Sequence, residues 1–459
     1  MLLYKYWMNY SLGKNIHSYD KGIKFGLRRW SSLGEFHLYE KLPNAPIICI
    51  DMNSFYVSCI ALLEEIDVHS LPIAVVGSLK QRGSVVLSAN RLLKEKFSIH
   101  TGSRLYEIPR HPDIRLFEPK MSFFMEMSVE ITKLIANFVP LDAIHVYSID
   151  EAFVDLTGCE NMWGDVETIA KSIQDAIYQQ FKIHSSVGMG PNILVAKLAL
   201  DIEGKKTGFA RWTYWDIPNK LWKVSPLSEM WGIGQRMEKK LNAMGIYRVG
   251  DLANAKLSEL EKKFGIMGNQ LYYHAWGIDL SEIGEKKSTN MNARNLSFGK
   301  SQMLMHDYKG RREILVVLLE MCEDVAKRAR EKEYSARTIS LGLAYSRHVT
   351  MVENFYRSRT IEEPTNDTML IYNVCKELLD EFFGGEPARQ LSVRISNVSK
   401  EHGFQLDLFD PDKAKRHHLA RTMDSIRDRF GQTSLLRAVS YTKDGTAISR
   451  SKLVAGHLE

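Results

Sequence analysis

The chain has 459 residues, and because hydrophobic cores stop growing at about 250–300 residues, we expect roughly two to four domains. Its content of 44% hydrophobic and 25% charged residues is ordinary for globular proteins and excludes a wholly disordered or fibrous chain. No apolar run reaches the roughly 18 residues of a membrane span. The five cysteines are scattered, odd in number and without a CxxC pair, which argues against a disulfide framework or a zinc site and fits a reducing cytosol.

Positive charge is concentrated at the two ends of the chain. Lys and Arg outnumber Asp and Glu by 61 to 55, a net charge of +6. Residues 1–45 carry seven basic against three acidic residues, and residues 410–459 carry ten against six. Such ends suit a polyanionic partner, although solvated tails would show the same pattern.

The first 45 residues are aromatic and basic and contain no secretory signal pattern. The low number of acidic residues is compatible with a transit peptide, but the Tyr and Trp content is high for such a peptide. We therefore predict an extension, 1–45, that is loosely ordered and lies outside the working domains.

From residue 46 the hydrophobic pattern predicts an α+β domain on a mixed sheet. Strands are expected at 47–50, 72–76, 84–88, twice within 143–157 as a hairpin, and at 185–189; helices are expected at 54–65, 92–97, 121–138, 165–181 and 192–202. Residues 220–285 change to short helices separated by glycine, and 286–292 reads as a linker. Residues 293–400 return to α+β, and residues 401–459 read as a polar, basic tail.

Two acidic segments carry the candidate chemistry. Asp51 ends the first buried strand, and Asp150 and Glu151 lie together between two apolar strands. Clustered buried carboxylates repel one another, and oxygen ligands without His or Cys select Mg²⁺ or Mn²⁺. Alternatively, each acid is a strand-end residue hydrogen-bonded to backbone amides, but both segments lie at strand ends of one sheet and can converge.

The segments 48–56 (ICIDMNSFY) and 147–153 (YSIDEAF) resemble the two metal-binding motifs of Y-family translesion DNA polymerases. The UmuC/DinB group, particularly the UmuC-like proteins of Gram-positive bacteria and their mobile elements, is the most similar. The resemblance covers about residues 46–450. It implies a multidomain α+β right hand: a palm at 46–220 with small fingers at about 70–120, a helical thumb at 221–285, and a β-sheet little-finger domain at 293–400.

The same resemblance implies two-metal nucleotidyl transfer to a primer 3′-hydroxyl, with two Mg²⁺ ions that Mn²⁺ can replace. Asp51, Asp150 and Glu151 would be catalytic and, with the backbone carbonyl of Met52, would hold the ions. Tyr56 matches the aromatic steric gate that excludes a ribose 2′-hydroxyl. Alternatively, Tyr56 only packs on the inner face of its helix.

Further contacts are assigned only by the resemblance. Those to the nucleotide are Phe55, Tyr56, Arg91, Lys94 and Lys205, with Lys96 as a substitute; Arg91 and Lys94 depart from the family's Tyr-x-x-Arg pair, and Lys205 is offset by one residue. Those to DNA are Gly232 and Gly234 of a helix-hairpin-helix, together with Arg294, Lys300, Arg337 and Arg347. Solvated lysines and a helix-packing turn are the alternatives.

Residues 405–409 (QLDLF) resemble a sliding-clamp-binding motif, in which Gln405, Leu406, Leu408 and Phe409 would contact the bacterial clamp. The alternative is a tail segment that folds back on the protein. Primer-template DNA and dNTPs are the other expected partners, a UmuD-like accessory protein or recombinase filament is a further candidate, and no membrane partner is expected.

The expected function is therefore cytoplasmic translesion synthesis of low fidelity and processivity within SOS-type damage tolerance. A nucleotidyl cyclase shares the acid layout but needs neither the hairpin glycines nor the clamp-like peptide. A polymerase-derived DNA- or clamp-binding protein without activity is the second rival.

Overall fold

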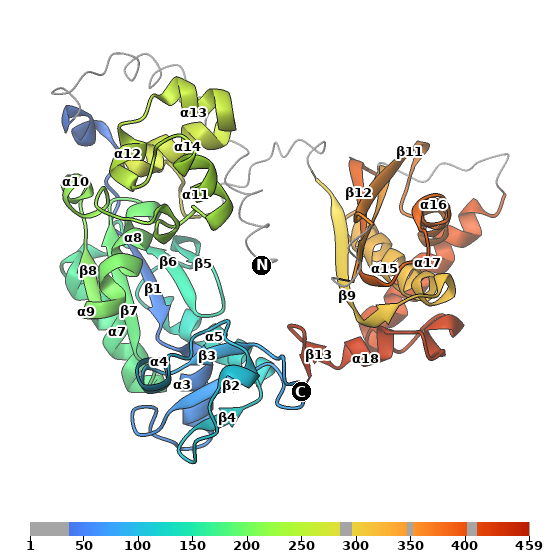
Figure 1. The fold of residues 1–459 in the computed structure, drawn as a ribbon, viewed down its shortest axis with the longest axis horizontal. Coiled ribbons are helices and arrows are strands. Elements are labelled where there is room, and N and C mark those ends of the chain that lie inside the picture. The colour runs from blue at the N-terminus through green and yellow to red at the C-terminus, as the bar shows by residue number, and fades with distance from the viewer. Residues whose placement is uncertain (1–35, 285–295, 347–351, 402–410, 459) are drawn as a thin grey trace. The chain divides into compact units, whose positions relative to one another are not determined.

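The computed structural model describes residues 36–284, 296–346, 352–401 and 411–458. The chain divides into two compact units, Met1–Lys286 and Lys287–Glu459 (Figure 1). No helix in the described ranges is long and apolar enough to cross a bilayer. In the first unit, the thumb helices and the small sheet of the fingers lie at opposite ends of the palm sheet (Figure 1).

Strand β1 (Ile47–Met52) is the middle strand of the palm sheet, whose order is β5-β6-β1-β7-β8. The other strands are β5 (Ile144–Val146), β6 (Glu151–Asp155), β7 (Ser185–Gly190) and β8 (Phe209–Arg211). β1 pairs antiparallel with β6 and β7, whereas β8 runs parallel to β7. The expected mixed sheet and the hairpin of β5 and β6 are confirmed. Residues 47–50 are all buried, so both faces of this strand are covered.

The helices of the palm form where apolar residues recur every four positions. α7 (Val166–Phe181) begins at Asp165, whose carboxylate accepts the backbone N–H groups of Glu167 and Thr168, and it buries a stripe of apolar residues four apart. α8 (Ile193–Ala199) continues through a π-helical turn, Leu200–Gly204, into α9 (Lys205–Thr207). The short helices α6 (Glu160–Trp163) and α10 (Ile217–Lys220) complete the palm.

Close packing of α8 on the sheet depends on a glycine of β7. A Cβ at Gly188 would lie 2.2 Å from the carbonyl oxygen of Ala196, so only glycine allows α8 to approach this closely. Residues of α8 then cover the sheet face that carries Cys49 and Phe153. This contact places the helix against the strand that carries Asp51.

The fingers contain a three-stranded sheet of order β3-β2-β4: β2 (Ile73–Val76), β3 (Val86–Ala89) and β4 (Arg115–Phe117). The surrounding helices are α3 (Phe55–Leu63), α4 (Arg91–Phe97) and α5 (Met121–Ile135). Asn90 joins these elements, because its amide oxygen accepts the N–H of Leu93 at the start of α4 and that of Ile73 in β2.

The thumb consists of α11 (Gln235–Asn242), α12 (Val249–Ala253), α13 (Leu257–Phe264) and α14 (Ile266–Ala275). Residue 39, which lies within the predicted extension 1–45, is not separate from the folded domains. The 3₁₀ helix η1 (Phe36–Lys41) contains Tyr39, which is buried and stacks on Tyr214 with ring centroids 5.0 Å apart. Its hydroxyl donates to the carbonyl oxygen of Trp276 after α14, so residue 39 belongs to the palm and thumb core.

The second unit is an antiparallel sheet of order β11-β10-β12-β9 with two helices on one face. Its elements are β9 (Phe298–Tyr308), α15 (Arg311–Glu331), β10 (Tyr334–Tyr345), β11 (Phe355–Thr365), α16 (Thr368–Phe382) and β12 (Ala388–Lys400). Inward residues such as Leu341 and Val393 pack against α15 and α16. Their neighbours Ser340, Gly342 and Ser392 alternate to the opposite face.

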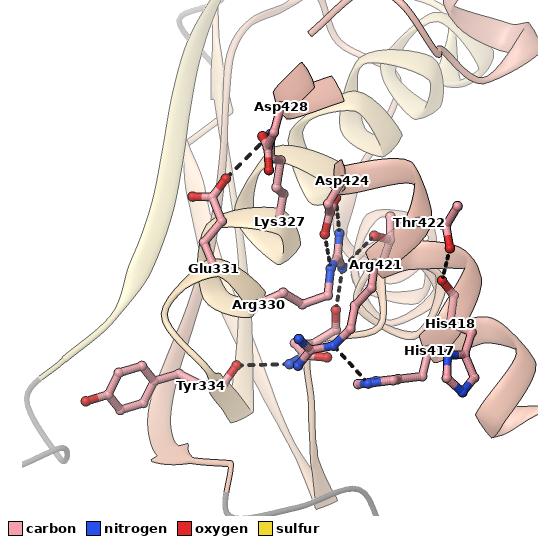
Figure 2. A network of polar contacts seen from close by, with 12 residues as sticks. Lys327, Arg330, Glu331, Tyr334, His417, His418, Arg421, Thr422, Asp424 and Asp428 are labelled. Carbon is pink, nitrogen blue, oxygen red and sulfur yellow. Dashed lines mark hydrogen bonds and ion pairs between the residues drawn. The ribbon is translucent and has the colours of Figure 1, made fainter. Parts of the chain in front are cut away.

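Residues 411–458 are not a simple tail, which corrects the prediction of a tail at 401–459 for this part of it. They form α17 (Lys413–Phe430), α18 (Ala447–Ser451) and the hairpin of β13 (Leu453–Val454) and β14 (His457–Leu458). We call residues 411–458 the C-terminal layer. It docks on α15 through charges: Arg330 of α15 and Asp424 of α17 point at each other and form two hydrogen bonds of 2.6 and 3.0 Å (Figure 2).

Candidate active site

Three carboxylates meet at one end of the palm sheet. Asp51, the penultimate residue of β1, pairs in register with Glu151, the first residue of β6. Asp150 precedes Glu151, and its carbonyl oxygen accepts the N–H of Met52. The Asp150 carboxylate accepts the hydroxyl of Ser148 at 2.6 Å. The structure therefore brings the predicted acids of the two segments together.

The three carboxylates differ in how their charge is balanced. Both oxygens of buried Glu151 are engaged, Oε2 by the ammonium of Lys197 at 2.8 Å and Oε1 by the thiol of Cys49 at 3.1 Å. The negative charge of Asp51 is less well compensated, since the ammonium of Lys205 is 3.8 Å away. Burial, with the charges of Asp150 and Glu151, raises the pKa of Asp51 to about 7 despite Lys205.

This donor set fits a hard divalent cation. Asp51 carries a desolvated carboxylate beside a second one, and an added cation would favour its ionised form. Glu151 points to Lys197, and in the described part of the chain no three His, Cys, Asp or Glu residues stand ready as a metal cluster. Asp51, Asp150 and the Met52 carbonyl are the candidates to hold a cation, whereas Glu151 would first have to leave Lys197.

The aromatic residues after Asp51 lie at the start of α3. Phe55 is buried, and Tyr56 is half-buried and stacks on Phe124 of α5 with centroids 4.6 Å apart. Burial and the charge of Asp150 raise the pKa of the Tyr56 phenol. Tyr56 is thus held by packing and also lies within electrostatic reach of the carboxylates.

The basic side chains of α4 that were predicted to contact the nucleotide point in different directions. Arg91 is 86% exposed and pairs with Glu95 at 2.6 Å. Lys94 instead reaches inward, with its ammonium 3.5 Å from the hydroxyl of Ser54, and burial lowers its pKa although Asp51 opposes this. Lys96 is exposed. Of these candidates, Lys94 is the one whose charge interacts with Asp51.

The DNA candidates lie in both units. Gly232 has φ +94°, a conformation that favours glycine, and Gly234 directly precedes α11. Arg337 is exposed at a bulge of β10. Lys300 lies on the helix-covered face of its sheet and pairs with Asp324 of α15 at 3.0 Å. Residues 294, 347 and 405–409, which include Arg294, Arg347, Gln405, Leu406, Leu408 and Phe409, lie outside the described residues.

Two charged residues of the site were not predicted from the sequence: Lys197, the buried partner of Glu151, and Asp201, which pairs with two lysines. A signal was present. Lys197 is the single charged residue of the apolar run 193–200, and Asp201 and Lys205 follow at intervals of four. A lysine inside a buried helix needs a carboxylate partner, and Glu151 provides it.

Comparisons with known proteins agree with this layout. The sequence model of the impB/mucB/samB family matches residues 50–201, that of its C-terminal domain matches residues 296–408, and that of the DNA polymerase-iota thumb domain matches residues 228–279. The chain is 50% identical over 421 residues to the Putative UV-damage repair protein UvrX of Bacillus subtilis (strain 168), covering 91% of this chain and 99% of that protein.

Two further relatives extend the comparison. DNA polymerase IV 2 of the same organism is 36% identical over 415 residues, which cover 90% of this chain and 98% of that protein. A solved Y-family DNA polymerase chimera, Dbh-Dpo4(243-245)-Dbh, superposes with a TM-score of 0.59 at 20% identity, covering 78% of this chain and all of the chimera. The chain therefore belongs to the UmuC-like Y family of translesion DNA polymerases, a class of DNA-directed DNA polymerases, which confirms the expected family and fold.

Proposed function

We propose that this protein extends a primer 3′-hydroxyl past damaged template bases, with Mg²⁺ as its physiological ion and Mn²⁺ as a substitute. The observation that carries the proposal is the convergence of Asp51 and Glu151 across β1 and β6, with Asp150 adjacent. A cyclase could share this convergence, but not the adjoining thumb domain that the comparisons identify.

The residues divide the work as follows. Asp51, Asp150 and the Met52 carbonyl would hold the cations, and Glu151 would join them on release from Lys197. When bound, two ions supply charge stabilisation to the attacking and leaving oxygens of an in-line displacement. Lys94 and Lys205 bring positive charge to the phosphate side of the site, where it would balance the triphosphate.

The test is primer extension by the intact chain on an undamaged template and on one with a single ultraviolet photoproduct. We expect extension on both templates with Mg²⁺ and none with EDTA, because the carboxylates need a cation to act. If the protein bound primer-template DNA but did not extend the primer with Mg²⁺ or Mn²⁺, it would be a DNA-binding protein without polymerase activity, and the proposal would be rejected. Electrophoresis of a labelled primer gives the readout.

Lys94→Ala is expected to raise the KM for dNTP by about tenfold, which corresponds to about 1.4 kcal/mol of lost phosphate contact. Arg91→Ala is the matched control, because Arg91 lies on the same helix but pairs outward with Glu95. We expect its KM to stay within about twofold of the parent. Single-nucleotide insertion kinetics measure both values, and a larger effect of Arg91→Ala would reverse the assignment.

Tyr56→Ala is expected to increase the ratio of ribonucleotide to deoxyribonucleotide insertion by about a hundredfold, or about 2.7 kcal/mol of lost discrimination. The ring of Tyr56 would meet a 2′-hydroxyl, and Phe124 holds that ring in place. Tyr56→Phe retains the ring and serves as the control. Discrimination that is the same in Tyr56→Ala and the parent would reject the gate.

We further propose that the second unit binds duplex DNA through its exposed sheet face. Tyr356 and Arg394 are exposed on this face, opposite Gly342 and Ser340 in the strand register. Phosphate contacts of this kind do not read sequence, and they would make binding salt-dependent. Lys300 is not part of this surface, because it pairs with Asp324.

We also retain residues 405–409 as a proposed clamp-binding peptide that recruits the protein during SOS-type damage tolerance. Replacing Gln405, Leu408 and Phe409 together by alanine is expected to abolish stimulation by the bacterial clamp and to leave unassisted extension unchanged. Extension on circular DNA with a loaded clamp, compared with linear DNA without it, measures the difference. Full stimulation of the triple variant would reject the motif.

A further inference from the structure

The helical segment that begins with α8 contains three charged residues of alternating sign, Lys197, Asp201 and Lys205, near the carboxylates of the site. Lys197 pairs with Glu151, and Lys205 lies 3.8 Å from Asp51. Between them, the same oxygen of Asp201, Oδ1, is 3.0 Å from the Lys197 ammonium and 2.9 Å from that of Lys205. The five charges thus form one chain that begins at Asp51 and ends at Glu151, its partner across the strands.

The π-helical turn explains how Lys205 shares a side of the helix with Lys197. In an α-helix, each step of four residues advances about 400°, so two steps rotate a side chain by roughly 80°. The N–H of Lys205 donates to the carbonyl oxygen of Leu200, five residues back, which widens this turn and reduces the rotation. The one-residue offset of Lys205 from the family pattern therefore coincides with a turn that accommodates an extra residue.

The two lysines depend on Asp201 to different extents. Lys197 is 6% exposed and retains Glu151 as a second close partner at 2.8 Å. Lys205 is 43% exposed, and within the described part of the chain its other ion-pair partner is Asp51, at the longer distance of 3.8 Å. Loss of the Asp201 charge would therefore free Lys205 to swing into solvent or move onto Asp51, while Lys197 would stay on Glu151.

We propose that Asp201 is a positioning residue that holds Lys205 at the mouth of the site, ready to exchange Asp51 for the incoming triphosphate. This inference depends on the proposed function, because it assigns Lys205 to the nucleotide. Asp201 itself touches neither substrate nor reacting atoms. Its contribution is to keep a flexible ammonium within reach of the phosphates, which lowers the ordering cost of nucleotide binding.

The test combines Asp201→Asn, Lys205→Met and the double variant. Asp201→Asn keeps the shape of the side chain and removes its charge, and we expect it to raise the KM for dNTP by about five- to tenfold while kcat changes by less than about twofold. In the Lys205→Met background the same substitution is expected to have no further effect, because Asp201 acts through Lys205. Asp201→Glu is expected to restore part of the affinity.

A binding measurement keeps this test independent of turnover. The affinity of the protein and a dideoxy-terminated primer-template for a non-hydrolysable dNTP analogue should fall by the same factor in Asp201→Asn. Glu167→Gln, which disrupts the exposed palm pair with Arg211, is the matched control and should leave the affinity unchanged. Thermal unfolding of each variant verifies that it is folded.

Two results would overturn the inference: unchanged nucleotide affinity in Asp201→Asn, or an equal loss with and without Lys205. The second result would mean that Asp201 acts through Lys197 and Glu151 instead. If the parent itself neither bound the analogue nor extended primers, the proposed function would fail, and the role of Asp201 with it. The parent measurement therefore separates the two failures.

Discussion

Replacing Asp51 by asparagine is expected to reduce the rate of primer extension by about a thousandfold, or about 4 kcal/mol of transition-state stabilisation. Asparagine keeps the size of the side chain but offers a neutral oxygen in place of the charge that would hold the cations. Asp175→Asn, at an exposed carboxylate of α7, is the control and should keep the parental rate. If Asp51→Asn retained more than a tenth of that rate, the three-carboxylate centre would be wrong.

The same substitution has a second expected effect, on stability without divalent ions. The folded-state pKa of Asp51 is about 7, above its ordinary 3.8, chiefly because of burial. The folded protein therefore binds this proton more tightly than the unfolded chain does, and the contribution of Asp51 to stability falls as the pH rises from about 4 through 7. In EDTA, we expect Asp51→Asn to be more stable than the parent at pH 8, and the difference to shrink at pH 5. Thermal unfolding at both pH values measures it, and a difference that does not depend on pH would contradict the assignment.

The second large effect concerns the C-terminal layer. Asp424→Ala is expected to lower the free energy of unfolding of the second unit by about 3–5 kcal/mol, because it leaves the guanidinium of Arg330 buried without its partner. Arg330 is 5% exposed, and its remaining contacts, such as the carbonyl oxygen of Asn366 at 2.8 Å, carry no compensating charge. Denaturant unfolding measures the loss.

Lys415→Ala is the control for this prediction, since Lys415 is 84% exposed in its pair with Asp412 and should contribute less than about 1 kcal/mol. Replacing both buried partners, as in Arg330→Met with Asp424→Leu, should recover most of the stability, because no charge is then buried alone. Equal losses in Asp424→Ala and Lys415→Ala would show that α17 does not depend on this pair.

The elements of the fold that could be predicted from the sequence are those with a clear hydrophobic pattern. The strand at 47–50 and the helix at 165–181 are marked by apolar runs or four-residue spacing, and both form as expected. The C-terminal layer was missed because α17 docks through buried charges, which have no apolar periodicity to detect. Tyr39 was missed for a related reason, since one aromatic residue in a basic segment does not show that it has a partner 237 residues away.

The site was predicted to a similar extent. The acids stand out because carboxylates rarely interrupt apolar strands, and they do converge. Lys197 could be recognised as a lysine inside an apolar helix, but its pairing with Glu151 could not, because it depends on how α8 packs on the sheet. The side of Lys300 was within reach of sequence reasoning, however, since strict alternation from Phe298 places it on the apolar face.

The face of α15 that meets the C-terminal layer has a consequence for how the second unit depends on that layer. The residues that meet the C-terminal layer, Glu320, Glu323, Lys327 and Arg330, carry two negative and two positive charges. In a chain that ended before α17, these charged side chains would be exposed to solvent, and together they would add no net charge and no apolar patch to the surface. Loss of the whole layer would therefore leave these charges solvated, whereas replacing one of them would leave its partner buried without compensation.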